Sequence, residues 1–180
     1  MPTYVAFLRA INLGATRKFP KSAIIAAAEA AGCTDVATHI NTGNVLVSTP
    51  LRSRTAVETA LERAFETDRG FTVPTIAFTP AELRRVVADA DELAAEMPSV
   101  GSQYVSLLKD EPSDDVRRFA EAGSTDHARL VVRGRAAHLL LDETENFGTT
   151  RLSNTYVEKK LGTATNRNVR VVRAISEKWC

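Results

Sequence analysis

The chain has 180 residues, of which 44% are hydrophobic and 25% are charged. A chain of this length and composition can bury a hydrophobic core, which excludes wholesale disorder, a collagen-like repeat and a coiled coil. The 23 basic and 22 acidic side chains leave a net charge of only +1, which excludes a surface dominated by one sign of charge.

The first half of the chain alternates between strand-like and helix-like segments. Thr55 and Glu58 have the spacing of a capping box, as do Thr79 and Glu82, and each pair predicts the start of a helix. The predicted order is strand Thr3–Leu8, helix Pro20–Ala31, strands Val36–Ile40 and Val45–Ser48 around the turn Asn41–Asn44, helix Thr55–Arg69, strand Phe71–Phe78 and a helix that begins at Pro80.

The second half repeats the same order at an offset of about 100 residues, since Tyr4–Arg9 aligns with Tyr104–Lys109. Its last segment, Asn166–Lys178, is predicted as a helix, and strand is an alternative for the β-branched run Val169–Val172. The predicted elements are strand Gln103–Leu108, helix Ser113–Ala122, strands Leu130–Arg133 and Ala137–Asp142 around the turn Gly134–Arg135, helix Leu152–Leu161 and the terminal segment.

These elements predict an α+β protein made of two ferredoxin-like halves, each an antiparallel sheet with helices on one face. The halves are expected to cover residues 1–92 and 101–180, joined by a connection at residues 93–100 that contains Pro98. A strand–helix–strand crossover makes the first two strands of each half parallel. The loop after the first strand therefore lies at the same end of the sheet as the turn after the second strand.

Asparagine, glycine and basic residues concentrate in the segments that this topology brings together. Residues 1–50 carry four basic and two acidic side chains, residues 51–126 carry nine and fifteen, and residues 127–180 carry ten and five, so both ends are basic. Asparagine offers a donor pair and an acceptor, arginine a fork of donors, and glycine allows close approach of the backbone. The candidate ligand-binding residues are Arg9, Asn12, Gly14, Asn41, Gly43, Asn44, Lys159, Arg167 and Asn168.

Each of these segments also has a purely structural interpretation. The run Asn41–Asn44 supplies residues that a tight turn needs anyway, and Thr165 or Asn166 would be an ordinary cap of the last helix. If Thr165 or Asn166 caps that helix, its free N–H groups and dipole would face the same spot as Arg167. In the second half, Gly162–Asn168 is expected beside the turn at Gly134.

Four segments resemble an uncharacterised bacterial family, domain of unknown function 1697. They are Tyr4–Gly14, Ile40–Val45, Val157–Gly162 and Thr165–Asn168, and their order and spacing cover nearly the whole chain. The resemblance implies an α+β fold with two ferredoxin-like halves and no settled activity.

The chain departs from the pattern of that family at three positions. The family usually has glycine where this chain has Ala10 and Ala15, and tryptophan where it has Val169. If the glycines serve close approach of a ligand, we expect binding to be altered or lost in this chain.

Other chemistries find less support in the sequence. His39, His127 and His138 have no metal-ligand spacing, and we expect neither a metal nor a cofactor. His39 stands two residues before Asn41, where it would serve as a general base only within hydrogen-bonding reach of a substrate proton. Asp142, Glu143 and Glu145 are interpreted as a solvated loop.

The compartment is expected to be the cytoplasm. The two cysteines, Cys33 and Cys180, are too few for a disulfide framework, and free thiols are typical of a reducing environment. The run Tyr4–Leu8 is too short for a signal peptide, and no stretch approaches the roughly 20 apolar residues of a membrane span. We therefore expect no membrane partner.

The sequence favours binding of a small anionic ligand, phosphate- or nucleotide-like, at the site rich in asparagine, arginine and glycine. The sequence does not decide between binding and catalysis, because it contains no recognisable pair of a general base and a nucleophile. An RNA or single-stranded nucleic-acid module is an alternative, which would use exposed aromatic residues on the central strands. A protein-interaction scaffold, in which the acidic middle segment contacts the partner, is another.

Overall fold

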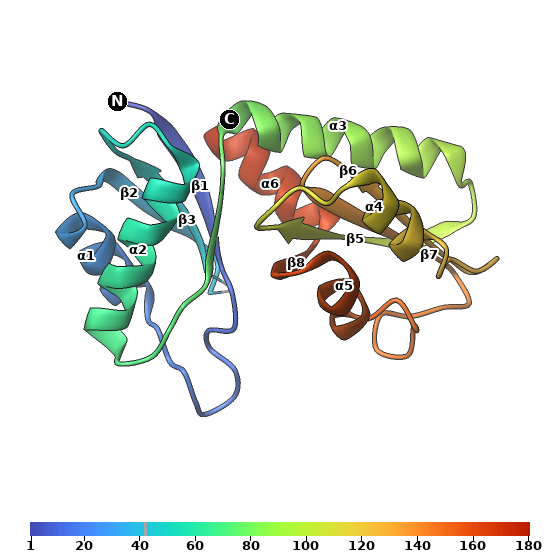
Figure 1. The fold of residues 1–180 in the computed structure, drawn as a ribbon, viewed down its shortest axis with the longest axis horizontal. Coiled ribbons are helices and arrows are strands. Elements are labelled where there is room, and N and C mark those ends of the chain that lie inside the picture. The colour runs from blue at the N-terminus through green and yellow to red at the C-terminus, as the bar shows by residue number, and fades with distance from the viewer. Residues whose placement is uncertain (42) are drawn as a thin grey trace. The chain divides into compact units, whose positions relative to one another are not determined.

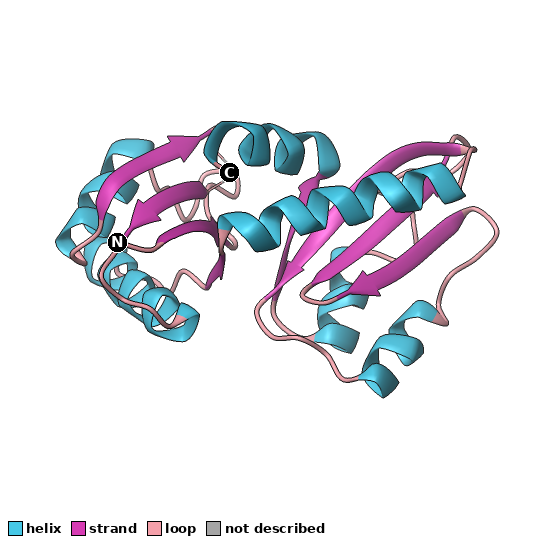
Figure 2. Cartoon of the chain, turned by 90° about the horizontal axis from the view of Figure 1, so that it is seen from above, coloured by secondary structure: helices cyan, strands magenta, loops and turns pink. Residues whose placement is uncertain are grey.

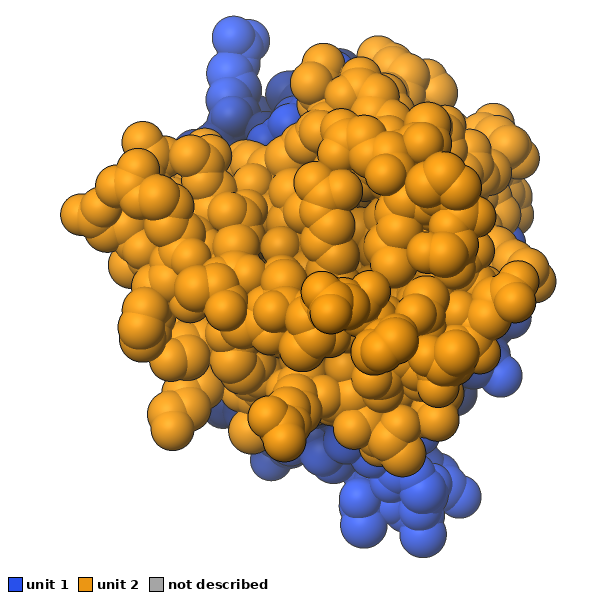
Figure 3. All heavy atoms as spheres, turned by 90° about the vertical axis from the view of Figure 1, so that its right-hand side faces the viewer, with its two compact units in different colours: residues 1–82, 179 blue, residues 83–178, 180 orange. Residues whose placement is uncertain are grey.

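The computed structural model describes residues 1–41 and 43–180, so Thr42 of the predicted turn lies outside the described residues. The chain divides into unit 1, residues 1–82 with residue 179, and unit 2, residues 83–178 with residue 180 (Figure 3). The elements of the first half are β1 (Thr3–Leu8), α1 (Lys21–Ala30), β2 (Thr34–His39), β3 (Asn44–Ser48), α2 (Arg54–Arg69), β4 (Thr75–Phe78) and α3 (Pro80–Glu96). Those of the second half are β5 (Val100–Leu108), α4 (Asp114–Glu121), β6 (Ala128–Arg133), β7 (Ala136–Asp142), α5 (Asn154–Leu161), β8 (Ala164–Asn168) and α6 (Val169–Trp179) (Figure 1).

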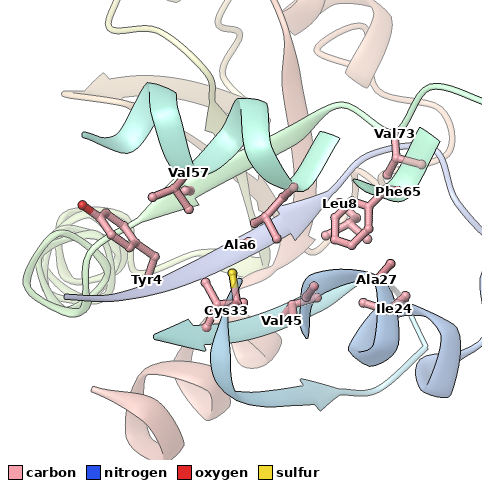
Figure 4. Close-up of a cluster of buried hydrophobic side chains, with 14 of the residues drawn as sticks. Tyr4, Ala6, Leu8, Ile24, Ala27, Cys33, Val45, Val57, Phe65 and Val73 are labelled. Carbon is pink, nitrogen blue, oxygen red and sulfur yellow. The ribbon is translucent and has the colours of Figure 1, made fainter. Parts of the chain in front are cut away.

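Unit 1 is built on an antiparallel sheet of order β2-β3-β1-β4, which is the order of a ferredoxin-like fold. The helices α1 and α2 pack on one face of this sheet, where the side chains of Tyr4, Ala6 and Leu8 point (Figure 4). Helix α2 contributes a stripe of buried residues four positions apart, Val57, Leu61 and Phe65. The predicted crossover topology of the first half is thereby confirmed.

Unit 2 repeats this architecture with a sheet of order β6-β7-β5-β8. The repeat extends to single hydrogen bonds: the N–H of Leu8 donates to Gly43 at 2.7 Å, and that of Leu108 donates to Arg135 at 2.9 Å. The α+β class with two ferredoxin-like halves is therefore confirmed.

Both faces of the sheet in unit 2 are covered. Helices α4 and α5 form the predicted layer on the face that carries Leu108, Leu130 and Leu139. Successive residues of a strand point to opposite faces, and Gln103 on the other face donates from Nε2 to the carbonyl of Ala90 in α3 at 3.0 Å. Figures 1 and 2 show α3 running along this second face. Helix α3 extends to Glu96, so residues 93–96 of the segment expected as a connection (93–100) are helical.

The prediction for the terminal segment was wrong in its first residues. Residues 164–168 form β8, which pairs with β5, and the β-branched run Val169–Val172 lies in α6 instead of in a strand. The cap of α6 is therefore neither Thr165 nor Asn166. It is Asn168, whose side chain accepts a hydrogen bond from the N–H of Arg170 at 2.9 Å.

Two acidic side chains of α2 cover the outer edge of β4 instead of capping their own helix. Ser53, not Thr55, is the N-cap of α2. The carboxylate of Glu58 accepts from the N–H of Ala77 at 2.9 Å, and that of Glu62 accepts from the N–H of Thr75 at 2.8 Å. The N–H groups of Thr75 and Ala77 in this edge strand are thus hydrogen-bonded within unit 1.

The capping box at the start of α3 forms as predicted. The N–H of Thr79 donates to Glu82 at 2.7 Å, and the N–H of Glu82 donates to the hydroxyl of Thr79 at 3.2 Å. Cys33 and Cys180 are both free thiols. Among the residues described, no helix combines the length and apolarity needed to cross a bilayer.

Candidate functional site

The loop after β1 and the turn after β2 meet at one end of the sheet in unit 1. Besides the bond from Leu8 to Gly43, the side chain of Asn12 donates from Nδ2 to the carbonyl of Asn41 at 2.8 Å. The convergence inferred from the parallel crossover is therefore present, and it joins residues 29 positions apart in the chain.

Asn12 acts within this loop as a clamp. Its Oδ1 accepts a hydrogen bond from the N–H of Phe19 at 2.8 Å, while Nδ2 reaches both Asn41 and the carbonyl of Phe19. Both ends of the amide are thus engaged with the backbone, and the side chain fixes the loop against the start of α1.

Gly43 and Asn44 are buried in the turn and serve its packing. A Cβ on Gly43 would come within 2.7 Å of the Cβ of Leu8, and the residue has a φ of +76°. Asn44 is 0% exposed, and its Nδ2 donates to the carbonyl of His39 at 3.0 Å. Arg9 is half-buried, and its N–H donates to the carbonyl of Pro74 at 2.9 Å. These positions hold the end of the sheet together.

A hollow of about 720 Å³ opens where the loop and the turn meet the start of α1. The exposed side chains of Lys18 and Lys21 supply two positive charges at its wall. The residues that line it are Asn12, Gly14, Lys18, Phe19, Pro20, Lys21, Ser22 and Asn41. Three of the predicted site residues, Asn12, Gly14 and Asn41, are therefore brought together.

The start of α1 adds backbone donors to this hollow. Pro20 occupies the N-cap position and has no side-chain oxygen, so no side chain caps the helix, and its first turn has no acidic residue. The first N–H groups of an α-helix have no partner inside the helix and carry the positive end of its dipole. Sequence reasoning missed Lys21 and Ser22. The signal that could have found them is a helix start with Pro20 at the capping position and no acidic residue in the first turn.

The predicted residues of the second half do not gather in one place within unit 2. Thr163 accepts a hydrogen bond from the N–H of Lys109, and Arg135 accepts one from the neighbouring Leu108, so Thr163 lies at the same end of the sheet as that turn, with β5 between them. Asn168, however, pairs with Tyr104 at the far end of β8, because residues 164–168 are extended instead of helical. The expectation that all of Gly162–Asn168 lies beside Gly134 is corrected accordingly.

Arg167 is buried, with 8% of its surface exposed. Its Nη1 donates to the hydroxyl of Thr165 and to the carbonyl of Asn166, each at 2.8 Å, and burial lowers its pKa to about 10. Lys159 is an exposed residue in the last turn of α5. Neither residue belongs to the lining of the hollow.

The histidines have separate environments. His127 and Asp142 form an ion pair, with 2.7 Å between Nδ1 and Oδ2, whose hydrogen bond raises the pKa of His127 and lowers that of Asp142 to about 2. His39 is half-buried at the end of β2. Within residues 1–41 and 43–180, no group of three or more His, Cys, Asp or Glu side chains is arranged to hold a metal ion.

Comparison with known proteins finds a family of unknown function and a solved structure of similar fold. Residues 1–138 match the model of the family described as protein of unknown function (DUF1697). The fold is similar to that of the conserved bacterial protein SP0830 from Streptococcus pneumoniae, with a TM-score of 0.75 and 18% sequence identity over 99% of this chain and 98% of that one. None of the curated proteins compared with the chain matches it.

Proposed function

The chain belongs to the DUF1697 family of proteins of unknown function, and we propose that it binds a small anionic ligand, phosphate- or nucleotide-like in chemistry, in the hollow of unit 1. The observation that carries the proposal is the meeting of two lysines and an uncapped helix N-terminus in one concave place. Backbone N–H groups at a helix start and nearby ammonium groups are the donors that phosphate groups take in proteins.

The lining also offers groups that suit the remainder of such a ligand. The hydroxyl of Ser22 can donate and accept hydrogen bonds, and the ammonium groups of Lys18 and Lys21 are exposed. Gly14, with a φ of +58°, presents backbone without a side chain in the way. Of the nine residues predicted from the sequence, three line the hollow. Lys18, Lys21 and Ser22 line it as well.

The repeated architecture provides an internal comparison. Helix α4 holds the position in unit 2 that α1 holds in unit 1, and the side chain of Ser113 caps it. Its first turn carries Asp114 and Asp115, which repel an anion and already complement the helix dipole. The N-terminus of α1 therefore favours an anion, whereas the N-terminus of α4 is capped and negatively charged. Because the two helices hold equivalent positions, this difference does not follow from the fold alone.

The aromatic residues give the nucleic-acid alternative little support. Base stacking on such a sheet needs exposed rings on the central strands. Tyr4 and Phe7 of β1 are buried, and Tyr104 of β5 stacks on Phe147 with 4.3 Å between ring centroids.

Isothermal titration and thermal unfolding with inorganic phosphate, AMP and neutral adenosine test the proposal. A ligand present at 100 times its Kd stabilises the folded chain by about 2.7 kcal/mol. We expect phosphate and AMP to bind and adenosine alone not to bind. The double variant Lys18→Gln with Lys21→Gln is expected to weaken binding roughly tenfold or more, the loss typical of charge-assisted hydrogen bonds.

The control is Arg63→Gln, which removes one positive charge from an exposed position in the middle of α2. We expect it to leave binding unchanged within twofold. Equal binding of adenosine and AMP, or equal losses in the double variant and the control, would contradict the proposal. An RNA oligomer that binds more tightly than AMP, with a steep dependence on salt, would favour the nucleic-acid alternative.

A further inference from the structure

The backbone of the loop after β1 adopts a conformation that its residues do not favour by themselves. Ala10, Asn12, Gly14 and Arg17 all have φ values between +53° and +58°. Residues other than glycine rarely take this left-handed conformation, so a loop that contains three of them needs contacts that hold it. The side chain of Asn12 supplies one such set of contacts, as described above.

Arg17 supplies a second set, in which its guanidinium donates to two backbone carbonyls. Its Nε donates to the carbonyl of Ala10 at 2.6 Å, and its Nη2 donates to the carbonyl of Thr72. The guanidinium carbon lies 4.5 Å from the ring centroid of Phe71, and the backbone carbonyl of Arg17 accepts from the N–H of Asn12 at 2.9 Å. One residue thus closes the loop on itself and fastens it to the segment before β4.

We propose that Arg17 is a positioning residue for the anion-binding hollow, an inference that rests on the proposed function. Arg17 directly precedes Lys18, and its backbone is bonded to Asn12, so it joins two residues of the lining. With the loop held in advance, the ligand does not have to order it on binding, which preserves affinity. Arg17 acts through the geometry of its neighbours, and it is itself absent from the lining.

The geometry requires arginine and not merely a positive charge. The planar guanidinium donates in two fixed directions and stacks on an aromatic face, whereas an ammonium group is a single point at the end of a flexible chain. Lysine at position 17 would keep the charge but would not hold Ala10 and Thr72 together. The variants Arg17→Lys and Arg17→Gln therefore separate positioning from simple electrostatic attraction.

Hydrogen–deuterium exchange of the ligand-free protein tests the positioning directly. We expect both variants to accelerate exchange of the amides of residues 10–19 by about tenfold or more, with α2 unchanged, because the opening free energy of the loop alone falls. Lys18→Gln, which removes a charge of the hollow but no contact of the loop, is expected to leave this exchange unchanged. The exchange measurement does not depend on whether phosphate or AMP binds.

Titration with AMP then joins the positioning to the site. We expect Arg17→Lys to weaken binding of AMP as much as Arg17→Gln, by about tenfold. If Arg17→Lys binds AMP as the wild type does, or if the loop exchanges at its wild-type rate in both variants, the positioning role is refuted. If the wild type binds neither phosphate nor AMP while the loop still loosens in both variants, the proposed function fails and Arg17 only stabilises the loop, which overturns the inference as well.

Discussion

His138 should make the stability of unit 2 sensitive to mild acid. The side chain is 0% exposed on β7, and neither of its ring nitrogens has a hydrogen-bond partner among residues 1–41 and 43–180. Burial lowers its pKa from 6.5 to about 4. The smaller effects of two nearby charges oppose each other: Asp89 raises the pKa and Arg133 lowers it. The folded chain therefore keeps this imidazole neutral at a pH where the unfolded chain protonates it.

The magnitude follows from linkage between protonation and folding. Well above pH 6.5 the group is neutral in both states, so its protonation does not change the free energy of unfolding there. As the pH falls from 6.5 towards about 4, the unfolded state binds a proton that the folded state refuses, and stability is lost. The difference between the two pKa values corresponds to a loss of about 3 kcal/mol in total, of which roughly 2 kcal/mol is lost by pH 4.5.

Chemical denaturation of wild type and His138→Leu at pH 7 and pH 4.5 measures this loss. Leucine removes the titrating group and its unsatisfied nitrogens, so we expect the variant to be at least as stable at pH 7 and to lose roughly 2 kcal/mol less than the wild type at pH 4.5. The control is His127→Gln. The pKa of His127 is raised, chiefly by its hydrogen bond with Asp142, so its stabilisation is present below pH 6.5 and is lost as the pH rises through the folded pKa.

The two histidine variants therefore predict opposite dependences on pH. Equal losses of stability in wild type and His138→Leu between pH 7 and pH 4.5 would show that burial does not hold this imidazole neutral, and the reasoning from its missing partners would be refuted.

Three further substitutions probe the end of the sheet in unit 1 and its edge. Ala10→Gly should stabilise the chain by roughly 1 kcal/mol, since the φ of Ala10 is +57°, and thermal unfolding should show a midpoint higher by a few degrees. Gly43→Ala should destabilise the chain by about 2 kcal/mol or more, because its Cβ would lie 2.7 Å from the Cβ of Leu8 at a φ of +76°; an unchanged denaturation midpoint would contradict this. Glu58→Ala should cost about 1 to 3 kcal/mol in urea denaturation, because it removes the buried carboxylate that accepts from the N–H of Ala77, whereas an effect as small as that of Arg63→Gln would count against the role of Glu58 at the edge.

The convergence of loop and turn in unit 1 was predictable because it depends only on the direction of the strands. A right-handed crossover makes β1 and β2 parallel whatever their side chains are, and the bond from Asn12 to Asn41 confirms the result. The roles of the individual side chains were less predictable. Asn44 was a plausible ligand contact by residue type, but the hairpin buries it completely.

Helix starts show where local pattern is sufficient and where it is not. The box of Thr79 and Glu82 forms with the reciprocal hydrogen bonds that its spacing predicts. Thr55 and Glu58 have the same spacing, yet Ser53 caps the helix and the carboxylate of Glu58 is drawn to an edge strand 19 residues away. The hydrogen bond of Glu58 depends on the position of β4 beside α2, which the local sequence pattern does not contain.

The last segment was misjudged for a similar reason. Residues 164–168 carry no strong strand pattern, and their extended form is stabilised by pairing with β5. The sequence by itself determined the class, the repeat and the end of the sheet where the hollow lies, because hydrophobic periodicity, turn residues and crossover handedness act locally or by general rule. Only the tertiary structure decided which polar side chains line the hollow and which are used in packing, because a buried donor or acceptor takes its partner from whichever segment the fold places beside it.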